Sequence, residues 1–231
     1  MNTIAILPVK SFGAAKQRLG SMLGAGSRQA LAQAMFSDVL ASLRRVPGLR
    51  AVAVVTSDRV AESAALGDRV LVLRDTEQAG QSAAARIGIR HALATGFERA
   101  LLVPGDTPLL DPAEVAGLLD RAEQRELGVV VVADRHGSGT NALLLRPPDV
   151  IEPSFGPGSR ERHVAVAAAA GVRHDVDPVP TLALDVDTPE DLAQLAVALE
   201  GRRGQAPSTR GALRQLDRSR ASRAASLRVP V

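Results

Sequence analysis

The strongest constraint on the fold is the alternation, along the first 200 residues, of short apolar runs with segments of helical periodicity. The runs consist mainly of Val, Ile, Leu and Ala, as is typical of strands buried in a parallel sheet. Between them, apolar residues recur at intervals of three and four, as at Leu31, Met35 and Val39, which predicts helices. We therefore predict an α/β fold: a single domain, residues 1–200, with a mostly parallel, doubly wound sheet flanked by helices.

The boundaries of these elements follow from turn and capping residues. Two helix starts are well marked, because Asp111 and Thr188 are capping residues that each stand directly before a proline. The predicted helices are one that begins near Ser27, one after Asp58, and 81–95, 111–125, 160–170 and 189–200. The predicted strands are 3–8, 51–56, 69–73, 101–103, 127–133, 142–145, 172–176 and 182–186, of which 142–145 turns back antiparallel.

Composition excludes several classes of protein. There is no Trp, no Tyr and only four Phe, so a stacking surface for single-stranded nucleic acid is not expected. There is no Cys, which excludes disulfides and thiolate metal sites. The N-terminus lacks a signal pattern and no apolar run is long enough to cross a bilayer. We expect a cytoplasmic protein with no membrane partner.

Charge is unevenly distributed along the chain. Residues 201–231 contain eight Arg and one acid, so the formal net charge of +3 divides into +7 on this tail and −4 on residues 1–200. A fold built to bind nucleic acid would show the opposite distribution, so nucleic acid is an unlikely partner. The tail has little apolar periodicity, and we predict that it is disordered. Truncation at residue 200 is accordingly expected to leave activity largely unchanged.

Several familiar functional motifs are either absent or lack the secondary structure that they require. Gly137–Ala142 matches a dinucleotide-binding pattern, but a strand-like Leu run follows it where a helix would be required. No phosphate-binding P-loop pattern and no serine-hydrolase or zinc-protease pattern is present. The four His residues show no metal-ligand spacing, so each is interpreted as structural or exposed. The chemistry must therefore come from other residues.

An acidic residue follows the predicted strand 101–103. The strand stops at Pro104-Gly105, and Asp106 comes just beyond its carboxyl end. In open α/β sheets this edge is where ligands bind, and a carboxylate there can hold a metal ion against a phosphate. The alternative is that Asp106 only caps a turn.

A second acidic pair, Asp185 and Asp187, follows the predicted strand 182–186. Residues two apart on an extended segment point the same way, and two adjacent carboxylates favour a cation between them. With Asp106 they would supply three hard oxygen ligands, as Mg²⁺ or Mn²⁺ prefers. The alternative is that Asp187 caps the next helix and Asp185 is a surface residue. The spacing alone is weakly specific, because Asp175 and Asp177 repeat it.

A cationic loop follows the first predicted strand. Lys10 is the first charge after Pro8, and Lys16 and Arg18 follow within reach of the same sheet edge. A polyphosphate bound at that edge would need such cations. The alternative is a set of ordinary solvent-facing side chains.

Taken together, these motifs resemble one family. They are Leu-Pro-Val-Lys10, Ala-Lys16-x-Arg18-Leu, Pro-Gly-Asp106-x-Pro, Gly139-Thr140-Asn141, Phe-Gly156-x-Gly-Ser159 and Asp185-x-Asp187-x-Pro-x-Asp-Leu. In this order, over about residues 1–200, they are similar to the 2-phospho-L-lactate/phosphoenolpyruvate guanylyltransferase family. That family makes the activated precursor of coenzyme F-420 and has a nucleotide-diphospho-sugar transferase-like fold.

The resemblance implies a reaction. The phosphate of a three-carbon acid, phosphoenolpyruvate or 2-phospho-L-lactate, would attack the α-phosphorus of GTP and release pyrophosphate. The resemblance also implies a downstream transferase as the partner that receives the product. It also implies roles for individual residues. The residues that would bind the nucleotide are Pro8, Lys10, Lys16, Arg18, Gly80 and Ser82, and the catalytic residues would be Asp106, Lys10, Lys16 and Arg18. Mg²⁺ would be held by Asp106, Asp185 and Asp187. The acid would be bound by Thr140, Gly156 and Ser159.

Some alternatives stay open from the sequence. Relatives often carry Gly-Leu-Asn where this chain has Gly80-Gln81-Ser82, and a Ser hydroxyl offers a base fewer hydrogen-bonding groups than an Asn amide. A cytidylyl- or molybdopterin-type nucleotidyltransferase, or a sugar transferase, could use the same fold. A non-catalytic nucleotide-binding protein with a basic recruiting tail is a third hypothesis, against which the three intact carboxylates argue.

Overall fold

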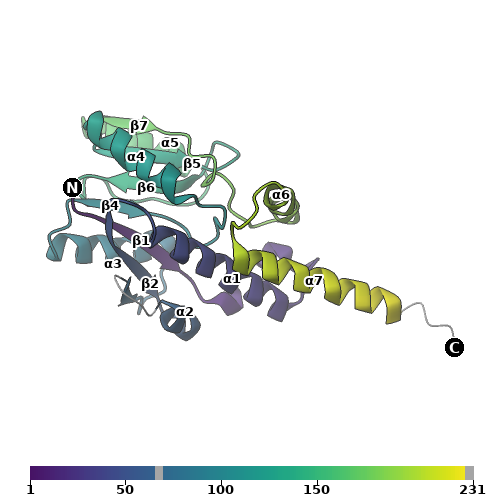
Figure 1. Ribbon diagram of the computed structural model, residues 1–231. Coiled ribbons are helices and arrows are strands. Elements are labelled where there is room, and N and C mark those ends of the chain that lie inside the picture. The colour runs from purple at the N-terminus through teal and green to yellow at the C-terminus, as the bar shows by residue number, and fades with distance from the viewer. Residues whose placement is uncertain (66–69, 227–231) are drawn as a thin grey trace.

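A computed structural model of the chain describes residues 1–65 and 70–226. Its centre is a seven-stranded sheet with the order β3-β2-β1-β4-β6-β5-β7 (Figure 1). All neighbouring strands pair in parallel except β6, which is antiparallel to both β4 and β5, as predicted for this segment. The strands are β1 (Thr3–Val9), β2 (Leu49–Thr56), β3 (Val70–Arg74), β4 (Arg99–Leu102), β5 (Val129–Ala133), β6 (Thr140–Leu145) and β7 (His174–Val176).

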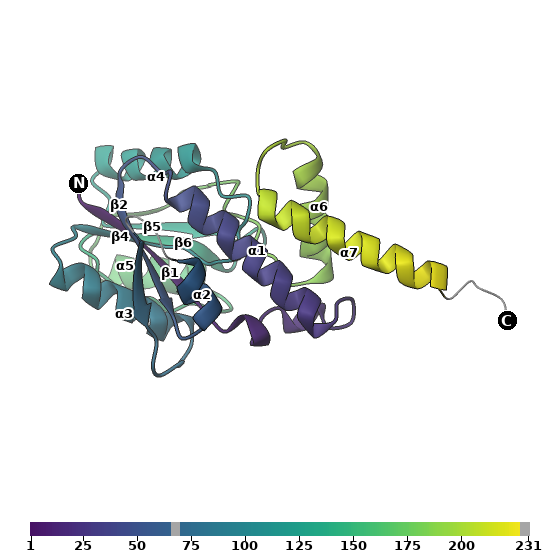
Figure 2. The ribbon, with the colours of Figure 1, turned by 60° about the horizontal axis from the view of Figure 1, so that its bottom comes forward.

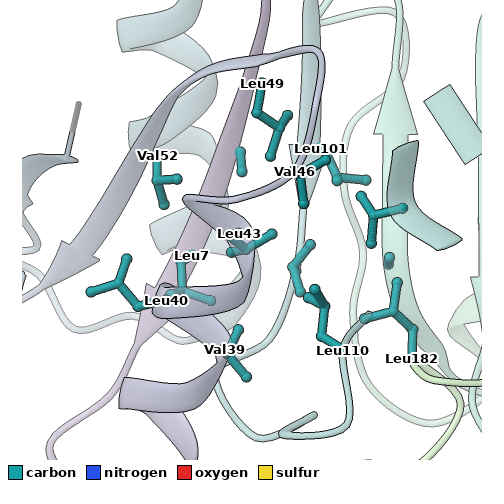
Figure 3. Packing of buried hydrophobic residues seen from close by; sticks show 14 of the residues in the cluster. Leu7, Val39, Leu40, Leu43, Val46, Leu49, Val52, Leu101, Leu110 and Leu182 are labelled. Atoms are coloured by element: carbon teal, nitrogen blue, oxygen red, sulfur yellow. The ribbon is translucent and has the colours of Figure 1, made fainter. Parts of the chain in front are cut away.

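Helices cover both faces of the sheet, which confirms the doubly wound α/β prediction. One face packs on helices α1, α2 and α4 through the aliphatic cluster in Figure 3, and the other packs on α3 and α5. Within the described residues, no helix is both long enough and apolar enough to cross a membrane. The helices are α1 (Ala25–Leu43), α2 (Arg59–Ala64), α3 (Gln81–Ala94), α4 (Pro112–Gln124), α5 (Ser159–Ala169), α6 (Pro189–Glu200) and α7 (Pro207–Ser226).

Two local predictions differ from the structure. The helix expected near Ser27 begins at Ala25, with Gly24 as its N-cap. The segment 182–186, predicted as a strand, forms a loop instead. Leu182 is buried in the same cluster as residues of β1 and β5, and Leu184 and Val186 are buried beside α1 and α6. None of them joins the sheet, so burial alone explains the apolar pattern. The first residue of the predicted strand 69–73 lies outside the described residues.

The prediction of a disordered tail over residues 201–231 is wrong for most of residues 201–226, and residues 227–231 lie outside the described residues. Helix α7 lies beside α1 and points away from the sheet (Figures 1 and 2). It helps to cover a third apolar cluster formed with α1 and α6, to which it contributes half-buried Leu213 and Leu216. Gln205, just before α7, donates from Nε2 to the carbonyl of Leu109 at 2.8 Å. The Arg content concealed this sparse helical spacing of apolar residues.

The start of α7 is held by a buried carboxylate of α1. Asp38 is only 4% exposed, and it accepts hydrogen bonds from the backbone N–H groups of Ser208 at 3.1 Å and Thr209 at 2.7 Å. The first N–H groups of a helix have no partner within it, and a carboxylate also complements the positive end of the helix dipole. Asp38 therefore acts as an N-cap supplied from another helix.

The substitution Asp38→Ala should lower the free energy of unfolding by about 1–2 kcal/mol, as loss of a helix cap does. Chemical denaturation measures this change, and hydrogen exchange at the amide of Thr209 should accelerate with it. Asp120→Ala is the matched control, because Asp120 is exposed on α4. Equal stability of the two variants would contradict the capping role.

Candidate active site

The predicted site residues gather around the carboxyl ends of β1 and β4. Chain order reverses between these neighbouring strands, since β2 and β3 lie on one side of β1 and β4 on the other. This is the switch point at which open α/β sheets bind ligands. Strand β4 leads through Pro104 and Gly105 to Asp106, and β1 leads to the loop that carries the predicted cations. Strand β6 runs the other way, so its first residue, Thr140, lies at the same edge.

The loop after β1 is folded tightly by two short 3₁₀ turns, Phe12–Ala14 and Gln17–Leu19. Phe12 is buried and its backbone N–H donates to Asp58 Oδ2 at 2.9 Å, while Leu19 is buried in the third cluster. Between these anchors Lys16 has a left-handed backbone conformation, with φ of 57°. This conformation is uncommon for a residue with a side chain and turns the loop back toward β4.

Lys16 forms the electrostatic centre of the site. Its side chain is 7% exposed, and Nζ lies 2.5 Å from Asp106 Oδ2 and 2.9 Å from Asp187 Oδ1. Burial by itself lowers the pKa of Lys16, but the two carboxylates more than offset it, so the pKa is raised and the ammonium stays charged. Neither Asp106 nor Asp187 is therefore merely a turn or helix cap. The N-cap of α6 is Thr188.

Asp185 belongs to the same acidic group. Burial raises its pKa, and the charges of Asp106 and Asp187 add to this effect, which places the three carboxylates within electrostatic reach of one another. A hydrogen bond from Asn141 Nδ2 to Asp185 Oδ1, at 3.1 Å, acts in the opposite direction. The backbone N–H of Val186 donates to the carbonyl of Asp106 at 3.2 Å and joins the two acidic loops.

The acidic group is compatible with a divalent cation, although no preformed metal cage exists among the residues that the structure describes. The Lys16 ammonium pairs with two of the three carboxylates and supplies a positive charge at the position where a cation would bind. Asp106 Oδ1 is buried and has no hydrogen-bond partner among the described residues, which is costly for a carboxylate oxygen. Hard oxygen ligands with one oxygen unsatisfied fit Mg²⁺, which would compete with Lys16 for them.

The remaining residues predicted to bind nucleotide lie around this centre in different environments. Pro8 is half-buried in β1, and Lys10 and Arg18 are exposed. Neither of these two forms an ion pair with any other described residue. Gly80 is the N-cap of α3 and has φ of 101°, which favours glycine. Ser82 Oγ accepts a hydrogen bond from the Phe155 N–H at 3.0 Å, so one of its acceptor positions is already used.

The residues predicted to bind the acid come from β6 and from the start of α5. Thr140 and Ser159 are buried, and Gly156 is exposed with φ of 113°. His163 of α5 lies between these segments, with Nδ1 3.0 Å from Thr140 Oγ1 and with Nε2 accepting from the Ser154 N–H at 2.8 Å. His163 is therefore buried rather than exposed, and its ring connects the two parts of the predicted acid site.

The residues that position the carboxylates were not predicted from the sequence. Asn141 is 5% exposed and donates to the carbonyls of Leu182 and Ala183 as well as to Asp185. Asp191 accepts from the Asp187 N–H at 3.0 Å and forms an ion pair with Arg135. An Asn within an otherwise apolar strand is unusual and could have been recognised as a positioning residue.

Comparison with known proteins gives a consistent result. The family model "Guanylyl transferase CofC like" matches residues 3–228. A phosphoenolpyruvate guanylyltransferase of Conexibacter woesei is 49% identical over 95% of this chain and 98% of the relative. A 2-phospho-L-lactate guanylyltransferase of Methanothermobacter thermautotrophicus is 33% identical over 87% of each chain.

Solved structures agree on the fold. A candidate nucleotide-diphospho-sugar transferase of Desulfovibrio desulfuricans superposes with a TM-score of 0.77 at 20% identity, covering 94% of this chain and 96% of that one. A CMP-2-keto-3-deoxy-manno-octonic acid synthetase complexed with CTP superposes with a TM-score of 0.58 at 14% identity, covering 87% of this chain and 99% of that one. The family match over nearly the whole chain, together with the relatives at 49% and 33% identity, shows that the chain belongs to the CofC-like guanylyl transferase family.

Proposed function

We propose that this guanylyltransferase transfers GMP from GTP to the phosphate of phosphoenolpyruvate with release of pyrophosphate, and that 2-phospho-L-lactate is the second candidate acceptor. The order of the candidates rests on the relatives: those at 49%, 43% and 38% identity are named for phosphoenolpyruvate, and the one at 33% for 2-phospho-L-lactate. The observation that carries the mechanism is the convergence of Lys16 with Asp106 and Asp187 at the switch point.

The chain's cations are suited to holding a triphosphate. Lys10 and Arg18 are exposed on the loop after β1 and can turn toward the phosphates, while Lys16 lies deepest, beside the carboxylates. Charged donors of this kind stabilise the negative charge that accumulates on a pyrophosphate leaving group. The acceptor phosphate is already ionised, so the reaction needs in-line positioning and charge neutralisation more than a strong general base.

Asp106, Asp185 and Asp187 would hold the Mg²⁺ that we propose as cofactor. When bound, the ion would neutralise charge on the phosphoryl oxygens and orient the nucleotide. The unpartnered Asp106 Oδ1 and the raised pKa of Asp185 both support the need for a further cation at this position. Asn141 and Asp191 would keep two of these ligands in place.

We further propose that the product serves coenzyme F-420 biosynthesis in the cytoplasm, with a downstream transferase as the enzyme that consumes it. Thr140, Gly156 and Ser159 would bind the carboxylate or phosphate of the acid. Ser159 stands at the start of α5, where free backbone N–H groups and the helix dipole favour an anion.

Pyrophosphate release tests the proposed function. GTP, ATP, CTP and UTP are each combined with Mg²⁺ and with phosphoenolpyruvate, 2-phospho-L-lactate or 3-phosphoglycerate. Release is expected with GTP and phosphoenolpyruvate, and more slowly or not at all with the other pairs. Release with CTP in place of GTP would show that Gly80 and Ser82 belong to a cytidylyltransferase-type base site. Silence of the folded protein in all combinations would contradict the proposal.

A further inference from the structure

His163 of α5 connects β6 with the loop that precedes α5, around the predicted acid site. The ring is buried, with 1% exposure, and its two nitrogens bond Thr140 of β6 and the backbone of Ser154. It also packs edge-on against Phe155, with ring centroids 5.5 Å apart and an interplanar angle of 73°. The backbone of Phe155 is in turn bonded to Ser82 at the start of α3. A single side chain thus links the acid side of the site to the nucleotide side.

The hydrogen bonds of His163 determine its tautomer. Nε2 accepts from the Ser154 N–H, so it carries no proton. In a neutral imidazole the proton is then on Nδ1, which donates to Thr140 Oγ1. Burial, together with the charge of Arg162, lowers the pKa of His163 to about 4, so the ring is neutral near neutral pH.

This tautomer has a consequence for Thr140. Because its hydroxyl oxygen accepts from Nδ1, its own hydrogen is left to donate to another group. An anionic oxygen is the acceptor that such a donor favours, since a hydrogen bond to a charged group is the stronger kind. With the opposite tautomer, the Thr140 hydroxyl would donate its hydrogen to Nδ1 and could only accept a hydrogen bond from a ligand.

We propose that His163 is a positioning and specificity-determining residue for the acid substrate, which orients the Thr140 hydroxyl as a hydrogen-bond donor to an anionic oxygen of that acid. The inference rests on the proposed function and deepens it. The second hydrogen bond of the ring, from the Ser154 N–H, holds the loop that carries Gly156. Arg162 also holds this loop, through hydrogen bonds to the Ser154 carbonyl and hydroxyl. His163 itself does not touch the reacting phosphates.

Two substitutions separate the two bonds of the ring. An Asn amide can replace Nδ1 and a Gln amide can replace Nε2, so His163→Asn keeps the donor to Thr140 and His163→Gln keeps the acceptor for Ser154. His163→Gln should raise the KM for the acid about tenfold, which is the effect of one hydrogen bond, and leave the KM for GTP and kcat within about twofold. His163→Asn should change the KM for the acid by less than about threefold, because Arg162 still holds Ser154 through its two hydrogen bonds.

Thr140→Val provides the decisive comparison, because it removes the hydroxyl and keeps the shape. It should raise the KM for the acid as His163→Gln does, and the double variant should be no worse than either single one, since both remove the same interaction. Thr140→Ser should restore the wild-type value. His174→Asn is the matched control, since His174 is half-buried at the start of β7, with Nδ1 bonded to the Val172 carbonyl.

Additive effects, or equal changes in the KM for GTP and for the acid, would overturn the role of His163 while the proposed function stands. A wild-type enzyme that transfers GMP to no phosphorylated acid would instead refute the proposed function, and this inference with it. If His163→Gln fails to fold, as judged by circular dichroism, the two Thr140 variants still decide: an unchanged KM for the acid in Thr140→Val overturns the proposal.

Discussion

The substitution Asp106→Asn is expected to lower kcat about 1,000-fold, which is the scale seen when a group that stabilises transition-state charge is removed. Asp106 lies at the switch point, bonds Lys16 and has a buried oxygen that no described residue bonds. Asn keeps the shape and one acceptor oxygen but loses the charge on which both the Lys16 contact and a metal ion depend. Steady-state pyrophosphate release at saturating substrates measures the loss.

The fold should tolerate the same substitution. Lys16 keeps its bond to Asp187, and the Asn oxygen can still accept from the ammonium, so the free energy of unfolding should fall by less than about 2 kcal/mol. Asp175→Asn is the matched control, because Asp175 has the same Asp-x-Asp spacing and an ion pair with Arg125 but lies on β7. Near-normal activity of Asp106→Asn would refute its assignment.

A measurement of metal binding distinguishes two explanations for the lower kcat of Asp106→Asn: loss of a metal ligand and loss of the contact with Lys16. Mn²⁺ can report on the proposed Mg²⁺ site through its electron paramagnetic resonance spectrum, without turnover. Asp106→Asn should weaken Mn²⁺ binding at least about tenfold, whereas Asp175→Asn should not. Unchanged Mn²⁺ affinity with lost activity would show that Asp106 acts through Lys16 alone.

Truncation after Glu200 is expected to lower the free energy of unfolding by at least about 3 kcal/mol, and to reduce activity with it. The deletion removes Leu213 and Leu216 from the third cluster and leaves the cap Asp38 without a partner helix. It also removes Gln205, which bonds the carbonyl of Leu109 in the loop that follows Asp106. The sequence alone predicted the opposite, a harmless deletion.

A second truncation, after Ser219, is the matched control. It keeps Gln205, Leu213 and Leu216 and removes only the Arg-rich end of the chain. Its stability and activity should stay close to those of the full chain, as measured by thermal unfolding and by pyrophosphate release. If both truncations behave like the full chain, α7 contributes nothing to the fold. If both fail equally, the last twelve residues matter in a way that packing of α7 does not explain.

The sequence predicted the sheet and the site edge because both depend on local patterns. Apolar runs marked the strands, and Asp58, Asp111 and Thr188 each cap the helix that they were expected to precede. The position of Asp106 followed from a strand stop and from the rule for parallel sheets, which needs no tertiary information. These features are determined by neighbours along the chain.

What the sequence did not predict depends on contacts between distant segments. Asn141 reaches Asp185 across 44 residues, and Asp38 reaches Thr209 across 171. Residues 182–186 are as apolar as a strand, but their apolar side chains are buried by distant segments of the chain without joining the sheet. The pairing of Lys16 with two carboxylates likewise requires a left-handed turn in a loop whose composition is unremarkable. Burial and charge pairing of this kind become visible only in three dimensions.

Phosphorus-31 NMR of a single reaction tests the central claim, that the acid's phosphate attacks the α-phosphorus of GTP. Wild-type protein, GTP, phosphoenolpyruvate and Mg²⁺ should give pyrophosphate and a pair of coupled diphosphate-diester signals in equal amounts, and Asp106→Asn should give neither. Formation of GDP with inorganic phosphate, or of pyruvate with the phosphate transferred elsewhere, would contradict guanylyl transfer to this acid.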